Sequence, residues 1–279
     1  MKKIALILLV LIIGCDDSFP QQNFPFEVKI SGKGKNTIIF IPGYACSSDV
    51  WNETLKVFEK DYKCIVLSMH GFAGVKADAN PNLKHWVDEI ARYIVWAKIK
   101  NPIIIGHSLG GIMALWLASD YPKLISKIVD IDAIPCYAAL LDANFQSNKK
   151  LDCSENIKGM QAMSENELHR TQRANMELMI ADTSKIETVV HWNLLSDRKT
   201  MGETFCEFLN TDLRDTIARV VCPSLIILEP SFKPSNAAII SQFKKMRPPK
   251  IIYANKGLHF IMFDDKDWYL NQLKAFVKY

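Results

Sequence analysis

The apolar and polar positions of the chain alternate between short apolar runs and longer amphipathic segments. A short apolar run bounded by glycine, proline or polar residues is typical of a strand, and apolar residues spaced three or four apart are typical of a helix. Residues 83–98 have the helical spacing, with Trp86, Ile90 and Ile94 on one face. We expect strands at residues 26–30, 37–41, 63–68, 102–105, 125–131, 225–228 and 250–253, and further helices at 111–119 and 267–277.

Strands that alternate with helices predict an α/β fold, with a mostly parallel central sheet flanked by helices on both faces. One segment breaks the alternation, because residues 136–215 contain no strong strand and several helical stretches, such as residues 165–180. An insertion of this length is too long for a loop in a compact domain. We therefore expect a helical cap over the carboxyl edge of the sheet, within one domain at residues 26–279. The methionines of the cap suit an adaptable apolar pocket.

The amino-terminal residues predict export and lipid attachment. Two lysines precede an unbroken apolar run at residues 4–13, which is shorter than the roughly 20 residues that a membrane-spanning helix needs. The run ends in a glycine followed by Cys15 and two aspartates. This arrangement resembles a bacterial lipoprotein signal, in which the cysteine is lipidated and becomes the new amino terminus. The resemblance implies a signal peptide at residues 1–14, a tether at residues 15–25, and anchoring to the membrane on the periplasmic or surface face of a bacterial cell envelope.

Composition and charge exclude other classes of protein. Hydrophobic residues make up 49% of the chain and charged residues 23%, which is ordinary for a globular domain. The net charge is +4, and it falls to +2 without the two lysines of the signal. Because there is no basic stripe either, we expect no nucleic-acid partner.

The cysteines show neither a CxxC pair nor a zinc-binding spacing, so we expect no metal site. Cys64 and Cys222 lie in or beside apolar strands, and we interpret them as buried thiols. An exported protein can hold disulfides. Cys136, Cys153 and Cys206 fall in one region, and the sequence leaves open which of them pair.

A glycine-rich turn at Gly106-His-Ser-Leu-Gly110 matches the nucleophile-elbow pattern G-x-S-x-G. An apolar strand leads straight into this turn and an apolar helix follows it. Glycines are needed there because the turn is strained and the neighbours of the serine must be small. The pattern therefore predicts Ser108 as a nucleophile.

A serine hydroxyl needs an adjacent base at neutral pH. His259 follows the last predicted strand and precedes the final helix, and parallel strands all end on one edge of the sheet. His259 can therefore meet Ser108 there, and we predict it as the base. His107 lies inside the turn, with its side chain directed away from that of Ser108. The remaining histidines fall in a turn or on predicted helices: His70, His85, His169 and His191.

Two strand ends offer an acid that could orient His259. Asp132 follows the strand at residues 125–131, one strand beyond that of Ser108, and we prefer it. Glu229 ends the strand at residues 225–228 and is the alternative. Asp264 and Asp265 follow His259 closely, and we interpret both as helix-capping charges.

Backbone N–H groups near the turn can stabilise an oxyanion. The amide of Leu109 begins the helix after Ser108, and we predict it as one donor. The second donor usually comes from the loop after an early strand. That loop contains Gly43, which permits a close backbone approach, and we predict the amide of Tyr44 as the partner.

These motifs resemble the α/β-hydrolase superfamily over nearly the whole mature chain. Four stretches carry the resemblance and appear in the order of the family at ordinary spacings: Ile41-Pro-Gly-Tyr44, His70-Gly-Phe-Ala-Gly74, Gly106-His-Ser-Leu-Gly110 and Gly257-Leu-His-Phe260. Among its branches, the chain looks like the single-domain capped esterases. In that family the commonest place for the acid corresponds to Phe232 here, which moves our prediction to Asp132. An acid on this strand is similar to the haloalkane dehalogenases, but those enzymes use an aspartate nucleophile, so Ser108 disfavours dehalogenation.

The sequence thus predicts a serine hydrolase that cleaves a carboxylic ester, or a related thioester or amide, through an acyl-serine intermediate. The substrate is expected to be a small ester-like molecule, and no metal or organic cofactor is needed. A non-catalytic module that holds an apolar ligand under the cap is the alternative of a different class. Acyl transfer to an acceptor other than water, or peptidase action on short peptides, would use the same residues.

Overall fold

The computed structural model describes residues 23–278. The predicted signal peptide, the lipidation site Cys15 and most of the tether lie outside the described residues. No helix within residues 23–278 is long and apolar enough to cross a membrane.

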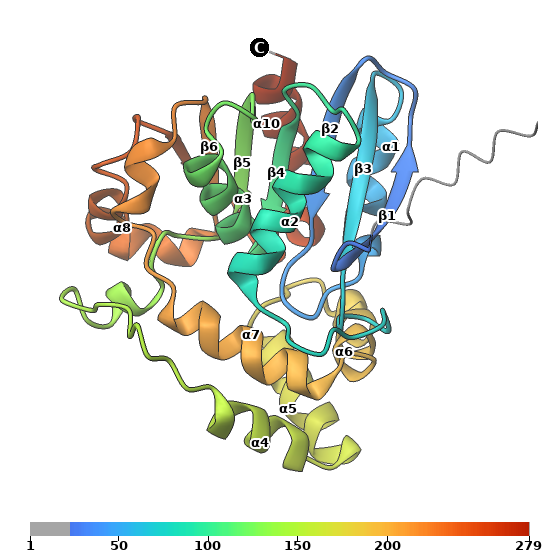
Figure 1. Cartoon of the computed structure of the whole chain (residues 1–279), viewed down its shortest axis with the longest axis vertical. Coiled ribbons are helices and arrows are strands. Elements are labelled where there is room, and N and C mark those ends of the chain that lie inside the picture. The colour runs from blue at the N-terminus through green and yellow to red at the C-terminus, as the bar shows by residue number, and fades with distance from the viewer. Residues whose placement is uncertain (1–22, 279) are drawn as a thin grey trace, which may run out of the picture.

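A seven-stranded sheet in the order β1-β3-β2-β4-β5-β6-β7 forms the centre of the molecule (Figure 1). Only β1, at one edge, is antiparallel to its neighbour β3, and every other pair is parallel. The middle strands are buried, as expected for parallel strands with helices on both faces. The strands are β1 (Phe26–Ser31), β2 (Asn36–Ile41), β3 (Tyr62–Met69), β4 (Ile103–His107), β5 (Lys127–Ile131), β6 (Ser224–Leu228) and β7 (Lys250–Tyr253). The prediction of a mostly parallel sheet is confirmed.

Helices cover both faces of the sheet and form two cores (Figure 1). Helices α2 (Leu83–Trp96) and α3 (Leu109–Asp120) pack on one face. Helices α1 (Asn52–Phe58) and α10 (Lys266–Lys278) pack on the other. Two short helices, α8 (Asn236–Gln242) and α9 (Ile261–Asp264), flank the last strand.

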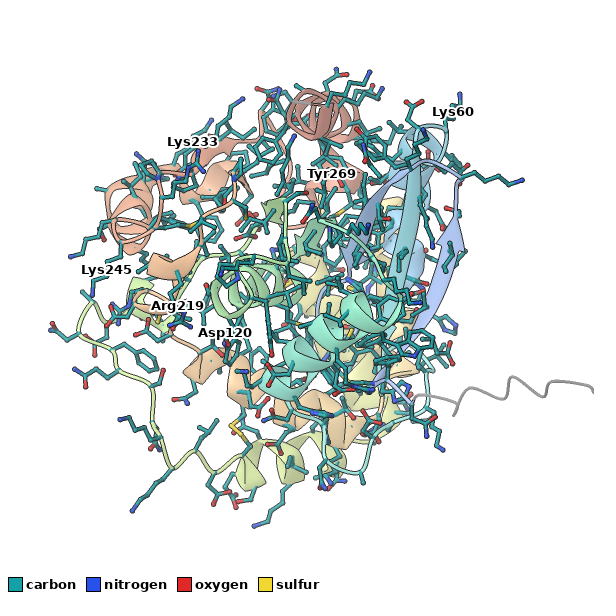
Figure 2. The ribbon with its side chains drawn as sticks, turned by 45° about the horizontal axis from the view of Figure 1, so that its top comes forward. Lys60, Asp120, Arg219, Lys233, Lys245 and Tyr269 are labelled. Carbon is teal, nitrogen blue, oxygen red and sulfur yellow. A yellow bond between two sulfur atoms is a disulfide. The ribbon has the colours of Figure 1, made fainter. Side chains whose placement is uncertain are left out.

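Polar side chains tie these helices to their neighbours. Tyr269 on α10, labelled in Figure 2, shares a hydrogen bond of 3.2 Å with Thr54 on α1. On the other face, Asp120 at the end of α3 forms an ion pair with Arg219 (Figure 2). The helix layers are thereby held by specific partners as well as by apolar packing.

The segment at residues 136–215 is helical and lies across the end of the sheet (Figure 1). It contains α4 (Ser154–Ala162), α5 (Glu165–Glu177), α6 (Ile186–Leu194) and α7 (Arg198–Asn210). A disulfide between Cys153 and Cys206 joins the start of α4 to α7. Cys136, Cys64 and Cys222 are buried free thiols. No residue of α4 is fully buried, and the helix is held by packing against α7 together with the disulfide.

Candidate active site

Ser108 lies between β4 and α3 in a strained backbone conformation. Its φ of 54° and ψ of −121° are sparsely populated for a residue with a side chain. The N–H of Ser108 donates to the carbonyl of Ile131 at 2.8 Å, and the carbonyl of Ser108 accepts from Gly111 at 2.8 Å. These bonds fix the turn between the neighbouring strand β5 and the first turn of α3. The sharp turn expected from the sequence is therefore present.

Two glycines make this turn possible. A Cβ atom at Gly106 would lie 2.0 Å from the carbonyl oxygen of Gly110. A Cβ atom at Gly110 would lie 2.2 Å from the carbonyl oxygen of Ile41, at the end of β2. Both distances are far inside van der Waals contact with rigid backbone. A side chain at either position would therefore push the turn away from the sheet and displace Ser108.

His259 and Asp132 meet at the carboxyl edge of the sheet. The Nδ1 atom of His259 lies 2.6 Å from Oδ2 of Asp132. Because a carboxylate can only accept, Nδ1 carries the proton and Nε2 is left as the basic nitrogen. The other oxygen of Asp132 accepts from the N–H of Glu229 at 2.6 Å. Asp132 has a φ of 58°, so the backbone turns sharply where β5 ends.

Glu229, the alternative acid, has a different position. Its carboxylate accepts from the hydroxyl of Ser231, two residues further on, and not from an imidazole. Burial, and secondarily the charge of Asp132, raise the pKa of Glu229 above its ordinary value. The structure thus brings Asp132 against His259, while Glu229 contributes its backbone N–H to holding Asp132.

Asp130 lies two residues before Asp132 on β5 and is fully buried. Burial, followed by the charge of Asp132, raises the pKa of Asp130 well above the ordinary value for an aspartate. Burial thus disfavours a second negative charge beside Asp132.

Ser108 and His259 line the same cavity. Within residues 23–278, the Ser108 hydroxyl makes no hydrogen bond to His259 or to any other side chain. Catalytic hydrogen bonds are often long in ligand-free structures and shorten when substrate binds. The structure thus joins His259 and Asp132 directly, and Ser108 lines the same cavity.

The predicted oxyanion donors are unpaired backbone amides. Leu109 is the first residue of α3, and Tyr44 lies in the loop after β2. Neither N–H has a hydrogen-bond acceptor among the described residues. The side chain of Tyr44 is anchored separately, because its hydroxyl donates to the carbonyl of Met201 at 3.1 Å. Burial raises the pKa of that phenol, which therefore stays protonated.

The sequence did not reveal a contact of His107 with His259. His107 is fully buried, and its Nε2–H donates to the carbonyl of His259 at 3.1 Å. Burial lowers the pKa of His107 well below its ordinary value, so the ring is neutral. The only indication of this contact in the sequence was the position of His107 at the end of β4, directly before Ser108. The residue expected to point away from Ser108 thus holds the backbone of His259, the predicted base.

Asp264 does not cap a helix in the way expected from the sequence. Its carboxylate accepts from the N–H of Leu258 at 2.8 Å, directly before His259. It also accepts from the N–H groups of Ala181 at 3.0 Å and Asp182 at 2.9 Å, between α5 and α6. Asp264 therefore connects the loop that carries His259 to the helical segment above it, a role that depends on tertiary contacts. Asp265 accepts from the N–H of Asn255 at 3.0 Å, in the same loop.

A cavity of about 470 Å³ lies between the strand ends and helices α4–α7. Its wall is mostly apolar and includes methionine and phenylalanine side chains from the helical segment, and no lysine or arginine of the described residues lines it. Phe232, at the place where an acid was sought, also lines it. The wall includes Met160, Met163, Met176, Met179, Phe205, Phe208 and Phe260. No cluster of three or more metal-ligating side chains occurs in the part of the chain that the structure describes.

The chain is similar in sequence to a known protein family and to known enzymes. Residues 36–162 match the model of the α/β-hydrolase fold family. The chain is similar to a pimeloyl-[acyl-carrier protein] methyl ester esterase from Wigglesworthia glossinidia brevipalpis. The two are 22% identical over 211 residues, which cover 73% of this chain and 77% of the relative.

Solved structures agree on the architecture. An enol-lactonase from Burkholderia xenovorans LB400 superposes with a TM-score of 0.74 at 11% identity, over 91% of this chain and 96% of that protein. An esterase from Exiguobacterium antarcticum superposes with a TM-score of 0.74 at 15% identity, over 91% of this chain and 96% of that protein. The chain therefore has the α/β-hydrolase fold. The prediction of an α/β-hydrolase-type enzyme is confirmed at this level, because the relatives and neighbours are esterases and hydrolases of that fold.

Proposed function

We propose that this chain, built on the α/β-hydrolase fold, is a serine hydrolase that cleaves a carboxylic ester, or a related thioester or amide, through an acyl-Ser108 intermediate. The observation that carries the proposal is the 2.6 Å contact between His259 and Asp132, in the cavity that Ser108 also lines. A binding protein would have no need of an oriented imidazole beside a strained serine. The name of the Wigglesworthia relative, a methyl ester esterase, supports an ester as the substrate.

Acylation begins when Nε2 of His259 accepts the proton of the Ser108 hydroxyl. The serine oxygen attacks the substrate carbonyl, and the carbonyl electrons move onto oxygen to form the tetrahedral oxyanion. The N–H groups of Tyr44 and Leu109 stabilise this oxyanion, since neither has an acceptor among the described residues. Asp132 stabilises the imidazolium and keeps the proton on Nδ1.

The intermediate then collapses, and the leaving alcohol takes the proton from Nε2 of His259. Water enters, gives a proton to the same nitrogen and attacks the acyl carbon. A second tetrahedral intermediate breaks down to the free acid, and Ser108 recovers its proton from His259. One ester and one water thus yield one acid and one alcohol.

Labelling with a fluorophosphonate probe, combined with hydrolysis of p-nitrophenyl esters, tests this proposal. We expect the wild type to be labelled at Ser108 and to release p-nitrophenol, and the Ser108→Ala variant to do neither. Ser241→Ala, on the exposed end of α8, is the matched control and should behave as wild type. Full hydrolysis by Ser108→Ala, or a wild type inert to both reagents, would reject the proposal.

We further propose that the chain is exported and lipidated at Cys15, which would anchor the hydrolase to a bacterial envelope membrane. The lysine pair, the apolar run and the Gly-Cys junction support this proposal. Expression in a bacterium fed labelled palmitate should give a labelled membrane-bound protein, whereas Cys15→Ser should be unlabelled. An unlabelled wild type would disprove the anchoring and leave the hydrolase proposal untouched.

A further inference from the structure

A few neutral polar side chains interrupt the apolar wall of the cavity. Thr171, Gln172 and Asn175 come from α5, and Asn193 comes from α6. These helices pack against each other across the end of the sheet (Figure 1), and both line the cavity that Ser108 also lines. The polar groups therefore face the same space as the proposed nucleophile.

Gln172 is the most unusual of these residues. It is only 5% exposed and lies on the buried face of α5, between Leu168 and Met176. Its side-chain amide has no hydrogen-bond partner among residues 23–278, although it borders the cavity. Although the residue is buried, its amide atoms stay accessible from the cavity. A side chain held by helix packing, with an accessible amide and no partner in the described part of the protein, is available to a polar group of a ligand.

Asn193 adds a second unpartnered group and fixes the location. It is 2% exposed, and its Nδ2 donates to the carbonyl of Ala45 at 3.1 Å. Its Oδ1 has no donor in the described part of the chain. Because Ala45 follows Tyr44, Asn193 lies beside the loop proposed to bind the oxyanion. The free acceptor is therefore close to the reacting centre.

The chemistry of these groups defines what they can bind. The Gln172 amide both donates and accepts, and the Asn193 oxygen accepts. No lysine or arginine of the described residues lines the cavity, while Glu229 does. An anionic group would therefore meet no counter-charge there. A neutral group with an N–H or O–H donor and an oxygen acceptor matches the wall.

We infer that Gln172 and Asn193 form a subsite for a neutral amide or hydroxyl group of the substrate. This inference rests on the proposed hydrolase function and narrows it. The substrate is an ester that carries such a group along an otherwise apolar chain, and not a plain fatty acyl ester.

Matched pairs of esters test the inference by kinetics. In the first pair the acyl group differs: the p-nitrophenyl esters of N-acetylglycine and of 4-methylpentanoic acid have the same shape, but only the first has an amide. In the second pair the alcohol differs: the acetates of N-(2-hydroxyethyl)acetamide and of 4-methylpentanol. The ratio of kcat/KM within each pair is compared between wild type and Gln172→Leu, after subtraction of the uncatalysed rate.

We expect the preference of the wild type for the amide-bearing ester to fall about 3- to 10-fold in Gln172→Leu, in at least one pair, as for one lost hydrogen bond to a neutral group. Gln161→Leu, on exposed α4 and outside the cavity wall, is the control and should keep the ratio of the wild type. Ratios in Gln172→Leu equal to those of the wild type in both pairs would mean that Gln172 contacts only water, and would overturn the inference.

A binding measurement separates this inference from the proposed function. Calorimetry compares N-butylpentanamide with 5-decanone, a ketone of the same length without the N–H donor, on the full-length protein. Gln172→Leu should lose affinity for the amide about 3- to 10-fold more than for the ketone. If Gln172→Leu shows this selective loss of affinity for the amide while the wild type hydrolyses no ester, the subsite stands and the hydrolase proposal fails. Equal losses for both ligands would refute the subsite whatever the activity.

Discussion

Replacement of Asp132 by asparagine tests the arrangement of the proposed base most directly. The carboxylate accepts from Nδ1–H of His259 through one oxygen and from the N–H of Glu229 through the other. An asparagine has only one oxygen, and its NH₂ group must face one of these two donors. If NH₂ faces the imidazole, the ring changes tautomer and presents Nε2–H to Ser108. If it faces Glu229, two N–H groups oppose each other at the end of β6.

The expected loss is large because the wrong tautomer cannot accept the proton of serine. In the Ser-His-Asp enzyme that illustrates this chemistry, the same substitution lowers kcat on the order of 10⁴-fold with little change in geometry. That factor corresponds to about 5.5 kcal/mol of transition-state stabilisation. We expect Asp132→Asn to lose activity on that order, with KM nearly unchanged because the cavity wall is intact.

Glu229→Gln is the matched control, since it also removes one carboxylate at a neighbouring strand end. It keeps the backbone N–H that binds Asp132, so we expect a loss of kcat below about 10-fold. The assay is kcat and KM on a p-nitrophenyl ester, with the rate of fluorophosphonate labelling and the melting temperature measured in parallel. The reasoning would be refuted if Glu229→Gln lost as much kcat as Asp132→Asn, or if Asp132→Asn stayed within tenfold of wild type.

Two further predictions concern stability. The disulfide between Cys153 and Cys206 closes a loop with a sequence separation of 53 residues, so the double serine variant should lose up to about 4 kcal/mol of unfolding free energy. Urea denaturation with and without reductant checks this, and an equal midpoint for variant and oxidised wild type would contradict it. His107 should make the fold acid-sensitive, because burial lowers its folded-state pKa well below 6.5 and the unfolded chain then binds more protons. As the pH falls below about 6.5, His107 should therefore reduce stability by up to about 1.4 kcal/mol per pH unit. His107→Gln, which keeps a donor for the carbonyl of His259, should lose less stability between pH 6.5 and pH 5, and equal losses in both proteins would count against the assignment.

The local pattern of the chain was sufficient to predict the sheet and the turn at Ser108. The apolar run before Ser108 has a place only in the buried centre of a parallel sheet, where both faces are covered. Gly106 and Gly110 are required because a Cβ atom at either position would lie within 2.5 Å of a backbone carbonyl oxygen. These constraints come from residues close to the serine or on the adjoining strand. His259 could be predicted as the partner of Ser108 from the topology, because the carboxyl ends of parallel strands lie at one edge of the sheet.

Contacts between distant segments could not be predicted in this way. Asp132 and Glu229 both end neighbouring strands, and the choice between them depends on the backbone turn at Asp132 and on the direction of each side chain. The pairing of Cys153 with Cys206 depends on how α4 packs against α7. Nothing near Asp264 in the sequence indicates that its carboxylate accepts a hydrogen bond from the N–H of Ala181. The two residues are separated by 83 positions.

The sequence by itself therefore determined the sheet, the strained turn, and the edge of the sheet at which Ser108 and His259 lie. These features follow from burial and backbone sterics along short stretches. Only the tertiary structure decided which carboxylate faces His259, which cysteines pair, and that Gln172 is buried without a partner over the same cavity. Such contacts depend on the packing of the helical segment against the sheet, which brings together side chains that no local pattern relates.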